Sequence, residues 1–300
     1  MEINSPKIAI GIVNYNGAEM TLNCISQLKN DTYSNKDFFV LDNHSSDDSI
    51  KLLTQNQNIT LIKNDLNQGY AGGANKIIEK ILLNKEYKYL LLINNDVQIN
   101  DPSFIGKLVE SVEKDEKVGF VCPKIFNLNG RIQETGASVL NALIFRKRGI
   151  NLAPEKFPKS PFRPEVYTGT CALMRVDALR KMTPPYEEDY FCYWEDIEIC
   201  LKLKKLGYVI EVIPSAEIVH LEGQTSKKHY SSRLEYLNIR NYLWTIRKHL
   251  NSFYKSIAIL LFLFPIFPKK IIWAALFSKN KKESITMIYD ATIQGFFTKR

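Results

Sequence analysis

An apolar stretch of this sequence ends abruptly in two amides and a carboxylate. The residues YLLLI at 89–93 run directly into Asn94, Asn95 and Asp96. A continuous apolar run of this kind is typical of a strand buried on both faces of a parallel sheet. A hard divalent cation takes oxygen ligands, commonly one or two carboxylates together with substrate phosphates and water. Asp96 therefore suits a metal site, with a solvated turn as the alternative interpretation.

A second pair of acids follows a cluster of aromatic residues. Glu195 and Asp196 come directly after YFCYW (190–194) and open an amphipathic helix. Acids are favoured in the first turn of a helix by its dipole, so capping is the alternative. Burial beside aromatic rings, however, raises the pKa of a carboxyl group and makes it a usable base near neutrality. We favour a catalytic function for this pair.

Two further segments have residue types that could bind a nucleotide. In VLDNHSSDDS (40–49), Asp42 and Asn43 stand at a strand end, where a carboxylate can accept from a pyrimidine imide or a ribose hydroxyl. The serines and acids after them have a simpler explanation as a helix N-cap. In NQGYAGGAN (67–75), the glycines would let the backbone approach a ligand closely before a helix N-terminus that favours anions. A tight turn into the helix remains the alternative there.

The apolar pattern predicts the elements that would position these residues. Strands are expected at 7–16, 37–43, 58–64, 87–96 and 118–126, alternating with helices at 18–29, 47–54, 73–84 and 102–113. This alternation predicts an α/β fold with a mostly parallel sheet and helices on both faces. Ligands bind at the carboxyl ends of the strands in such sheets, so the polar residues after three of these strands should share one edge. From 131 to about 220, we expect shorter mixed strands around one helix at 195–206.

Seven segments, in this order and spacing, resemble glycosyltransferase family 2 and, within it, the rhamnosyltransferase-like branch. They are IVNYNGAEMTLNCISQL, VLDNHSSDDS, NQGYAGGAN, LLLINNDV, TGTCALMRVDAL, FCYWEDIEICLKLKKLGY and VIPSAEIVHLEG. The resemblance covers roughly residues 7–250. It implies a GT-A fold, with a Rossmann-like, mostly parallel central sheet flanked by helices. We expect a catalytic domain at 1–225, divided at about residue 125 into a nucleotide-sugar-binding half (1–125) and an acceptor half (126–225).

The resemblance also implies roles for individual residues. Asp196 would be the general base, and Glu195 beside it would orient the sugar or acceptor. Asp96 and His220 would hold Mg²⁺ or Mn²⁺, although a lone histidine is by itself more often a structural residue. The residues expected to bind the nucleotide-diphospho-sugar donor are Asn14, Asn16, Asp42, Asn43, Asn67, Gly69, Tyr70, Gly73, Asn75, Asn94 and Asn95. Where many relatives have Asn-Pro-Asp or Asp-x-Asp, this chain has Asn94-Asn95-Asp96, so the first carboxylate is missing.

The last quarter of the chain differs from the rest in charge. Residues 221–300 contain 14 Lys or Arg against 4 Asp or Glu, whereas the whole chain has a net charge of +8. A basic patch of this kind favours an anionic partner, either lipid or nucleic acid. We expect no nucleic-acid partner, because the sequence contains no recognition module for one. A basic helix is expected at 230–250, followed by an apolar segment at 256–277.

The apolar segment is interrupted by Pro265, Pro268 and a lysine pair. Its longest apolar run, 257–268, has 12 residues, fewer than the roughly 20 that cross a bilayer. We therefore expect residues 226–300 to form a basic helical segment anchored at an anionic membrane surface. A buried helix or a homodimer contact is the alternative.

Together these patterns predict an inverting glycosyltransferase that acts on a lipid-linked or polysaccharide acceptor in cell-surface glycan synthesis. The branch resemblance favours rhamnose as the sugar, and the donor nucleotide would be dTDP, UDP or GDP. Five scattered cysteines without a CxxC pair indicate a reducing compartment, and the N-terminus lacks the pattern of a secretory signal. We expect a cytoplasmic protein, peripheral at the inner face of the cytoplasmic membrane. A non-catalytic nucleotide-sugar-binding or scaffold protein of the same fold is the alternative.

Overall fold

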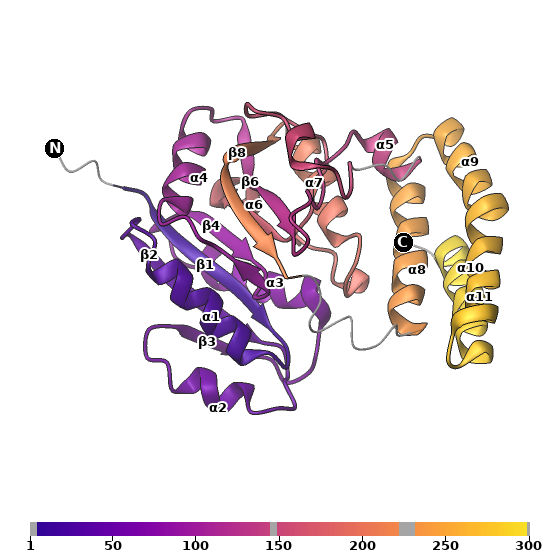
Figure 1. Cartoon of the computed structure of the whole chain (residues 1–300), viewed down its shortest axis with the longest axis horizontal. Helices are drawn as coiled ribbons and strands as arrows, with labels where there is room; N and C mark the ends of the chain where they lie inside the picture. Colours follow the sequence, from indigo (N-terminus) through magenta and orange to yellow (C-terminus); the bar gives the residue numbers. More distant parts are fainter. Residues whose placement is uncertain (1–4, 145–148, 222–231, 299–300) are drawn as a thin grey trace.

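The computed structural model describes residues 5–144, 149–221 and 232–298. Among these residues, eight strands form one sheet in the order β3-β2-β1-β4-β7-β6-β8-β5. The strands are β1 (Lys7–Asn14), β2 (Lys36–Asp42), β3 (Thr60–Lys63), β4 (Tyr87–Ile93), β5 (Val97–Gln98), β6 (Val118–Asn127), β7 (Cys171–Arg175) and β8 (Val209–His220). Figure 1 shows helices packed around this sheet and a further group of helices beyond α7 (Glu195–Lys205). The predicted α/β architecture is confirmed.

The sheet has a parallel half and a mixed half. Strands β3, β2, β1 and β4 are parallel neighbours, as the alternation of strands and helices predicts. In the second half, β7 runs antiparallel to both β4 and β6, while β6 and β8 are parallel and β5 is antiparallel to β8. The chain leaves β6 for a long excursion at 128–170 and returns in the opposite direction as β7. The sequence signal for that reversal was only the loss of the regular strand–helix rhythm.

The first three helices accompany the parallel half, whereas the fourth packs against β6 and β8 of the mixed half. These helices are α1 (Ala18–Lys29), α2 (Ser49–Thr54), α3 (Gly69–Leu82) and α4 (Phe104–Glu113). Helix α3 begins four residues before its predicted start at 73, so the glycine-rich segment forms its first turns rather than a preceding loop. The physical reason is close packing, because a Cβ added at Gly73 would lie 3.0 Å from Val13 Cγ1 and 3.1 Å from Leu41 Cδ2. Small residues let this helix approach the sheet.

The other helical elements come after β6 in the chain. They are α5 (Val139–Leu143), the 3₁₀ turns at Pro154–Lys156 and Glu188–Tyr190, α6 (Val176–Arg180), α7, α8 (Ser232–His249), α9 (Ser252–Leu261), a π-helical turn (Phe262–Ile266), α10 (Phe267–Phe277) and α11 (Lys281–Phe297). Helix α8 lies beside α7 and between it and the α9–α11 group (Figure 1). The predicted boundary between a catalytic domain and a C-terminal segment at 225–226 falls outside the described residues.

The prolines of the apolar segment do not end its helix. Residues 252–277 form one helical rod, with Pro265 inside the π-helical turn that joins α9 to α10. A π-helical turn shifts the hydrogen-bond register, which accommodates a proline that lacks a donor. Ala258, Phe262 and Ala274 are wholly buried, so one face of the rod packs against the molecule. By length and composition alone the rod could cross a membrane, and only 17% of its most apolar stretch is buried.

Candidate active site

The ends of three neighbouring strands are joined by side-chain hydrogen bonds. Asn14, the last residue of β1, donates from Nδ2 to Oδ1 of Asp42, the last residue of β2, over 2.9 Å. The Thr21 hydroxyl donates to Asn14 Oδ1 (2.8 Å) and accepts from Nδ2 of Asn95 (3.0 Å), just after β4. We call residues 14–16, 42–46 and 94–96 the polar edge. The structure brings together the residues that the sequence predicts to share this edge.

Asp42 is wholly buried within the polar edge. Besides the amide of Asn14, its carboxylate accepts from the backbone nitrogen (3.0 Å) and the hydroxyl (2.6 Å) of Ser45. Asn16 lies nearby in a left-handed backbone conformation, with φ of 51°, and its Oδ1 accepts from the Ser46 nitrogen over 2.8 Å. These bonds fix the turn at 42–46, and the contacts of Asp42 and Asn16 with a nucleotide stay predictions.

Asn43 fixes the start of helix α3. Its Nδ2 donates to Asn67 Oδ1 (3.1 Å) and to the Gly69 carbonyl (2.9 Å), and its Oδ1 accepts from the Gln68 nitrogen (3.1 Å). Gly69 has φ of +71°, and a Cβ there would collide with the backbone oxygen of Phe191. Glycine is therefore required at this close approach, which brings the first turn of α3 against residues 190–194.

Two other predicted donor residues of α3 contact the second half of the chain. The Tyr70 ring is partly buried, and burial together with the negative charges of Glu195 and Asp196 raises the pKa of its hydroxyl. The Asn75 side chain donates to the Tyr186 carbonyl (2.8 Å) and accepts from the Tyr186 nitrogen (3.0 Å). Asn75 therefore ties α3 to the segment before α7, a contact that sequence reasoning did not foresee. The donor-binding roles of Tyr70, Gly73 and Asn75 stay predictions.

Asp96 and His220 face each other although they are far apart in the sequence. His220 Nε2 lies 3.1 Å from Asp96 Oδ1, because Val97 pairs with His220 where β5 meets β8. The other ring nitrogen, Nδ1, lies 2.9 Å from Gln133 Oε1. Since an amide oxygen only accepts, it favours the proton on Nδ1 and leaves the Nε2 lone pair directed at the carboxylate. His220 Nε2 and Asp96 Oδ1 are both electron-rich, so this arrangement suits a cation that both atoms bind.

The chemistry of this pair suits a divalent metal that is completed by a substrate. Carboxylate oxygen is a preferred ligand of Mg²⁺ and Mn²⁺, and imidazole binds first-row transition metals. Within the described ranges, no group of three or more His, Cys, Asp or Glu side chains is arranged to hold a metal. Two protein ligands are the number expected where phosphate oxygens and water supply the remaining positions. Asp96 and His220 therefore fit the predicted site, with Gln133 orienting the histidine.

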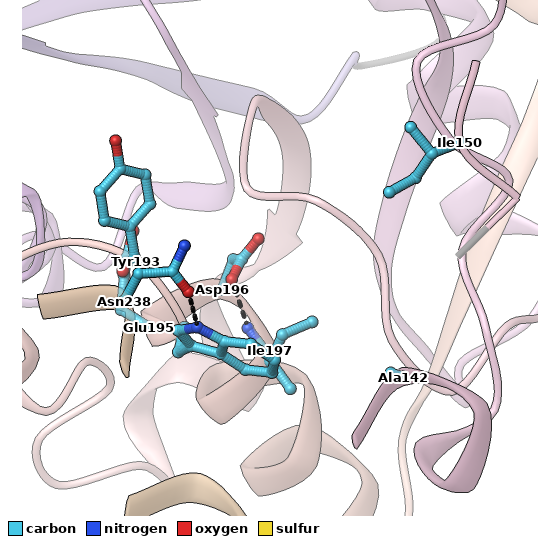
Figure 2. Close-up of a pocket in the computed structure, with 8 residues that line it drawn as sticks. Ala142, Ile150, Tyr193, Glu195, Asp196, Ile197 and Asn238 are labelled. Carbon is cyan, nitrogen blue, oxygen red and sulfur yellow. Dashed lines mark hydrogen bonds between the residues drawn. The ribbon is translucent and has the colours of Figure 1, made fainter. Parts of the chain in front are cut away.

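Glu195 and Asp196 open helix α7 at a pocket of about 220 Å³. Asp196 Oδ1 accepts from the Ile197 nitrogen (2.8 Å), and in Figure 2 its carboxylate lies across the pocket from Ile150. The residues that line the pocket are Ala142, Ile150, Tyr193, Trp194, Glu195, Asp196, Ile197 and Asn238. Glu195 is almost wholly buried, and its Oε2 has no hydrogen-bond partner among the residues that the structure describes. Burial, followed by the charge of Asp196, raises the pKa of Glu195 well above the usual carboxyl range.

A short segment before β7 lies between the acid pair and the polar edge. The Thr170 carbonyl accepts from the Asn94 nitrogen over 2.9 Å, and the Gly169 nitrogen donates to Asp196 Oδ2 over 3.4 Å. A Cβ at Gly169 would lie 3.1 Å from Asp196 Cβ, so the small residue permits this approach. Gly169 and Thr170 thus connect the acid pair on one side to the Asn94–Asp96 strand end on the other.

The family model for glycosyl transferase family 2 matches residues 9–183, which is more than half of the chain. The chain belongs to glycosyl transferase family 2. The polar edge, which includes Asp96, and segment 169–170 lie within the matched region. The acid pair Glu195–Asp196 and His220 come after it.

Curated relatives agree with this assignment. The chain is 24% identical over 235 residues to the low-salt glycan biosynthesis hexosyltransferase Agl10 of Haloferax volcanii, covering 78% of this chain and 73% of that protein. It is also 24% identical over 230 residues to the N-acetylglucosaminyl-diphospho-decaprenol L-rhamnosyltransferase of Mycobacterium tuberculosis, covering 69% and 74% respectively. The predicted likeness to the rhamnosyltransferase-like branch of family 2 is confirmed.

Solved structures confirm the GT-A fold. GalNAc-T7, solved with UDP, GalNAc and Mn²⁺, superposes with a TM-score of 0.65 at 16% identity, covering 97% of this chain. This chain spans only 55% of the GalNAc-T7 chain. The mannosyltransferase PcManGT of Pyrobaculum calidifontis, solved with GDP-Man and Mn²⁺, gives a TM-score of 0.59 at 13% identity, covering 99% of this chain and 89% of that one. At these identities the likeness establishes the fold.

This family 2 chain has a strained turn directly before its acid pair, which the sequence did not reveal. We call residues 190–194 the aromatic turn. Phe191, Tyr193 and Trp194 have φ of 64°, 68° and 73°, and left-handed backbone of this kind costs on the order of 1–3 kcal/mol per bulky residue. The Trp194 ring nitrogen donates to Asn238 Oδ1 of α8 over 2.8 Å (Figure 2). The aromatic cluster was visible in the sequence, but its left-handed backbone and its contacts with α8 were not.

Proposed function

We propose that the chain is an inverting, divalent-metal-dependent glycosyltransferase that moves a hexose from a nucleotide-diphospho-sugar to a hydroxyl group. The main support is the placement of Asp96, His220 and Asp196. The first two face each other with a geometry that fits a cation, and Asp196 opens a pocket on the other side of Gly169–Thr170. A metal-bound diphosphate and a general base are the two functions that such a transfer needs.

The donor would bind along the polar edge. The turns after β1 and β2 and the first turn of α3 lie beside Asn94–Asp96, so a nucleotide held there would place its diphosphate near the metal pair. The N-terminus of α3 adds backbone amides that favour anionic groups. The solved relatives that bind UDP or GDP-Man with Mn²⁺ support a nucleotide-linked donor, with dTDP, UDP and GDP as the candidates.

The proposed reaction is a single displacement. Asp196 removes the proton from the acceptor hydroxyl, whose oxygen forms a bond to the anomeric carbon on the face opposite the diphosphate. The bond from that carbon to the diphosphate oxygen breaks, its electron pair leaves with the nucleoside diphosphate, and the configuration inverts. The metal held by Asp96 and His220 would neutralise the charge of the departing diphosphate. Glu195, buried beside Asp196 with a raised pKa, would orient the sugar or acceptor.

The acceptor would be a lipid-linked or polysaccharide glycan, and rhamnose is the leading candidate for the sugar. The relative that acts on N-acetylglucosaminyl-diphospho-decaprenol supports both parts of this proposal. The pocket beside Asp196 has an apolar and aromatic wall, in which Tyr193 is 39% exposed and Ile150 is 56% exposed. Sugar rings commonly pack their apolar faces on such side chains, so the lining suits a glycan acceptor.

The α9–α10 rod would hold the protein at the inner face of the cytoplasmic membrane. Its buried face packs on the molecule, while large apolar side chains cover the rest. The exposed ones in the rod are Phe253, Leu260, Leu263, Phe264, Ile272, Trp273, Leu276 and Phe277. Lys269 and Lys270 interrupt the apolar sequence of the rod, and Lys270 is paired with Glu235 of α8. A rod tied to the bundle on one side suits insertion along the membrane surface rather than across the bilayer.

Donor turnover tests the proposed reaction. UDP-, GDP- and dTDP-linked hexoses would be incubated with Mn²⁺ and the full-length protein, and release of the nucleoside diphosphate would be measured. Asp196→Asn should lower turnover by about 10³-fold, because positioned acid–base groups contribute roughly 10²–10⁴. Glu110→Gln, on the exposed surface of α4, is the matched control and should keep full activity. Binding of a donor without turnover by the wild type would favour the non-catalytic alternative.

Flotation with vesicles tests the membrane proposal. The full-length protein should float with phosphatidylglycerol-containing vesicles and less with neutral ones. Replacing Phe264 and Leu276 by serine should weaken binding about tenfold or more, because each buried large apolar side chain contributes roughly 1.5–3 kcal/mol. Leu83→Ser removes a leucine outside the rod that is more exposed than either of these two side chains, and it serves as the control. Equal flotation of all three proteins would defeat the proposal.

A further inference from the structure

We infer that Asn241 of α8 is a positioning residue, which holds the aromatic turn in the conformation that presents Glu195 and Asp196 to the pocket. This inference rests on the proposed function, because it concerns the placement of the proposed base. It assigns part of the active site to a helix that the sequence places in the C-terminal basic segment. Helix α8 stands beside α7 in Figure 1, with the apolar rod on its other side.

The Asn241 carboxamide makes hydrogen bonds with both ends: its nitrogen bonds to the aromatic turn and its oxygen bonds to Arg240. Asn241 is wholly buried. Its Nδ2 lies 2.8 Å from the Tyr190 carbonyl, 2.9 Å from the Cys192 carbonyl and 2.9 Å from the Tyr193 carbonyl. An amide group has only two N–H bonds, so three carbonyl oxygens share two donors. The amide oxygen accepts from Arg240 Nε over 3.0 Å, which fixes which end of the group faces the turn.

The turn has a conformation that its own residues oppose. The Cys192 nitrogen donates to the Tyr190 carbonyl over 2.7 Å, which closes a γ-turn around Phe191 at φ of 64° and ψ of −66°. This form of γ-turn is rare and strained, and Tyr193 and Trp194 extend the left-handed backbone. Three carbonyl oxygens are thereby aimed at one point on α8. The hydrogen bonds from the Asn241 amide at this point compensate for backbone conformations that these residue types disfavour.

The turn in turn positions the acids. Trp194 is the N-cap of α7, and its carbonyl accepts from the Glu198 nitrogen over 2.9 Å in the first turn of the helix. Glu195 and Asp196 are the next two residues, so a displacement of the turn moves both. The Phe191 carbonyl also accepts from the Ala71 nitrogen (3.2 Å), which connects the turn to the first turn of α3. The buried Asn241 amide therefore fixes the position of Glu195 and Asp196 relative to the first turn of α3.

Neighbouring contacts of α8 act in the same direction. Asn238, one helical turn before Asn241, accepts from the Trp194 ring nitrogen, and Arg240 Nη2 donates to the Asp189 carbonyl over 2.7 Å. Through these contacts, α8 lies against the aromatic turn from its beginning to its end. Asn241 differs from them because it is wholly buried and bonds to three carbonyls of the turn itself. Its substitution should therefore change the geometry of the turn rather than the lining of the pocket.

The experiment compares three full-length variants in two measurements. Asn241→Leu keeps the approximate volume and removes the donors, and Asn241→Ser keeps a single hydroxyl in case the leucine variant does not fold. Ser284→Ala of α11 is the control, since it removes a partly buried hydrogen bond to Ser232 and a buried one to Ser278 within the same helical group. The first measurement is turnover and binding of the nucleotide-sugar that the wild type hydrolyses with Mn²⁺. The second is amide hydrogen exchange over residues 190–200.

Asn241→Leu should lower turnover at saturating donor by about 10²-fold, the effect expected of a base misplaced by about 1 Å. The donor dissociation constant should stay within about twofold, because the polar edge and the metal pair are untouched. Exchange at residues 190–200 should accelerate in the order wild type, Asn241→Ser, Asn241→Leu, and should not change in Ser284→Ala. Effects no larger than those of Ser284→Ala in both measurements would overturn the inference, and so would an equal loss of donor affinity and turnover. If the wild type hydrolyses no donor, the proposed function fails, and the exchange order alone decides whether Asn241 holds the turn.

Discussion

At the polar edge, Asn14, Asp42 and Asn95 hydrogen-bond through one another and through Thr21, whereas the aromatic turn takes its hydrogen bonds from α8, about 50 residues later in the chain. The edge is built from regular strand ends and short turns, and its buried carboxylate has several donors. The turn is built from left-handed backbone, and Glu195 after it has an oxygen with no hydrogen-bond partner within the described part of the chain. The two regions lie on either side of Gly169–Thr170.

This difference matches the two tasks that we propose for them. A binding surface benefits from side chains that are already fixed, because little has to be ordered when the ligand arrives. A general base needs a desolvated and accurately placed carboxyl group, which a protein keeps only where the surrounding structure enforces it. The side chains of Asn14, Asp42 and Asn95 are thus fixed within the first 100 residues, whereas the turn has its side-chain hydrogen bonds from α8. Four predictions, from the largest effect to the smallest, could break or sharpen this comparison.

The largest effect should come from Glu198, which anchors α7 to α8. Glu198 is wholly buried and pairs with Lys248 (2.6 Å) and His249 (2.5 Å). Burial opposes its ionisation, but the hydrogen bonds and charges of His249 and Lys248 outweigh burial and lower the pKa of Glu198 to about 2. Glu198→Gln should destabilise the protein by about 3–5 kcal/mol in urea unfolding at pH 7, because the buried His249 side chain and the Lys248 ammonium lose the carboxylate that pairs with them.

The contribution of Glu198 should also depend on pH with a definite sign. Its folded pKa is depressed, so the stabilisation is fully present above the usual carboxyl range and is lost as the pH falls toward about 2. The difference between wild type and Glu198→Gln should therefore shrink in acid. Glu165→Gln is the control, since its pair with Lys204 is exposed and should contribute at most about 1 kcal/mol. A Glu198 effect as small as that of Glu165 would contradict the dependence on α8.

The next largest effect should come from Gln133 on the metal side. Gln133→Leu removes the acceptor on His220 Nδ1 but leaves Asp96 and His220 in place. Outer partners of metal ligands commonly contribute 10–100-fold in affinity, so the Mn²⁺ concentration needed for half-maximal donor binding should rise by about that factor. Gln57→Leu, in the exposed turn between α2 and β3, is the control and should leave the Mn²⁺ dependence unchanged. A Gln133 variant with unchanged Mn²⁺ dependence would remove the metal role of His220.

A smaller effect is expected from Thr21→Val, which tests the hydrogen bonds that Thr21 makes with the polar edge. Valine has the shape of threonine, but the bonds to Asn14 and Asn95 are lost. Unsatisfied buried polar groups cost about 1–3 kcal/mol, so the free energy of unfolding should fall by that amount and donor affinity by about tenfold. Thr54→Val, at the exposed end of α2, should stay within about 0.5 kcal/mol. If Thr21→Val instead lowered turnover without affecting donor binding, the division between the two regions would be wrong.

The smallest effect should be the pH dependence of Glu195→Gln. Burial and the Asp196 charge raise the folded pKa of Glu195, so the folded state holds a proton that the unfolded state releases. Wild-type stability should therefore fall as the pH rises from the usual carboxyl range through the raised pKa. Glutamine cannot ionise, so the variant should gain in thermal midpoint relative to wild type between pH 5 and pH 9, by about 2–4 °C for each kcal/mol. A difference that is constant with pH would show that Glu195 is not held neutral by the fold.

Much of the fold could be predicted because its strands are long apolar runs with polar ends. Strands β1, β2 and β4 and helix α1 lie within a few residues of their predicted positions, and the sharing of one edge follows from parallel topology. Asp96 and His220 are 124 residues apart. Their meeting follows from the β5–β8 pairing, for which the sequence offered only a family resemblance.

The remaining features depend on tertiary contacts that have no local sequence signal. Thr21 and Gln133 are ordinary polar residues until the fold places them beside Asn95 and His220. The left-handed backbone at Phe191 is set by α8, and nothing in the residue type indicates it. Pro265 reads as a helix breaker, yet the π-helical turn keeps the rod continuous.

The most direct test of the account is a crystal structure with Mn²⁺ and the nucleoside diphosphate released by turnover, with the metal located by anomalous scattering. The account predicts one manganese peak bound by the Asp96 carboxylate and His220 Nε2, in contact with the diphosphate along the polar edge. The Asp196 carboxylate should open onto the same hollow, on the side where the sugar was attached. A manganese peak away from Asp96 and His220, or Asp196 facing a cavity that the nucleotide does not reach, would contradict it.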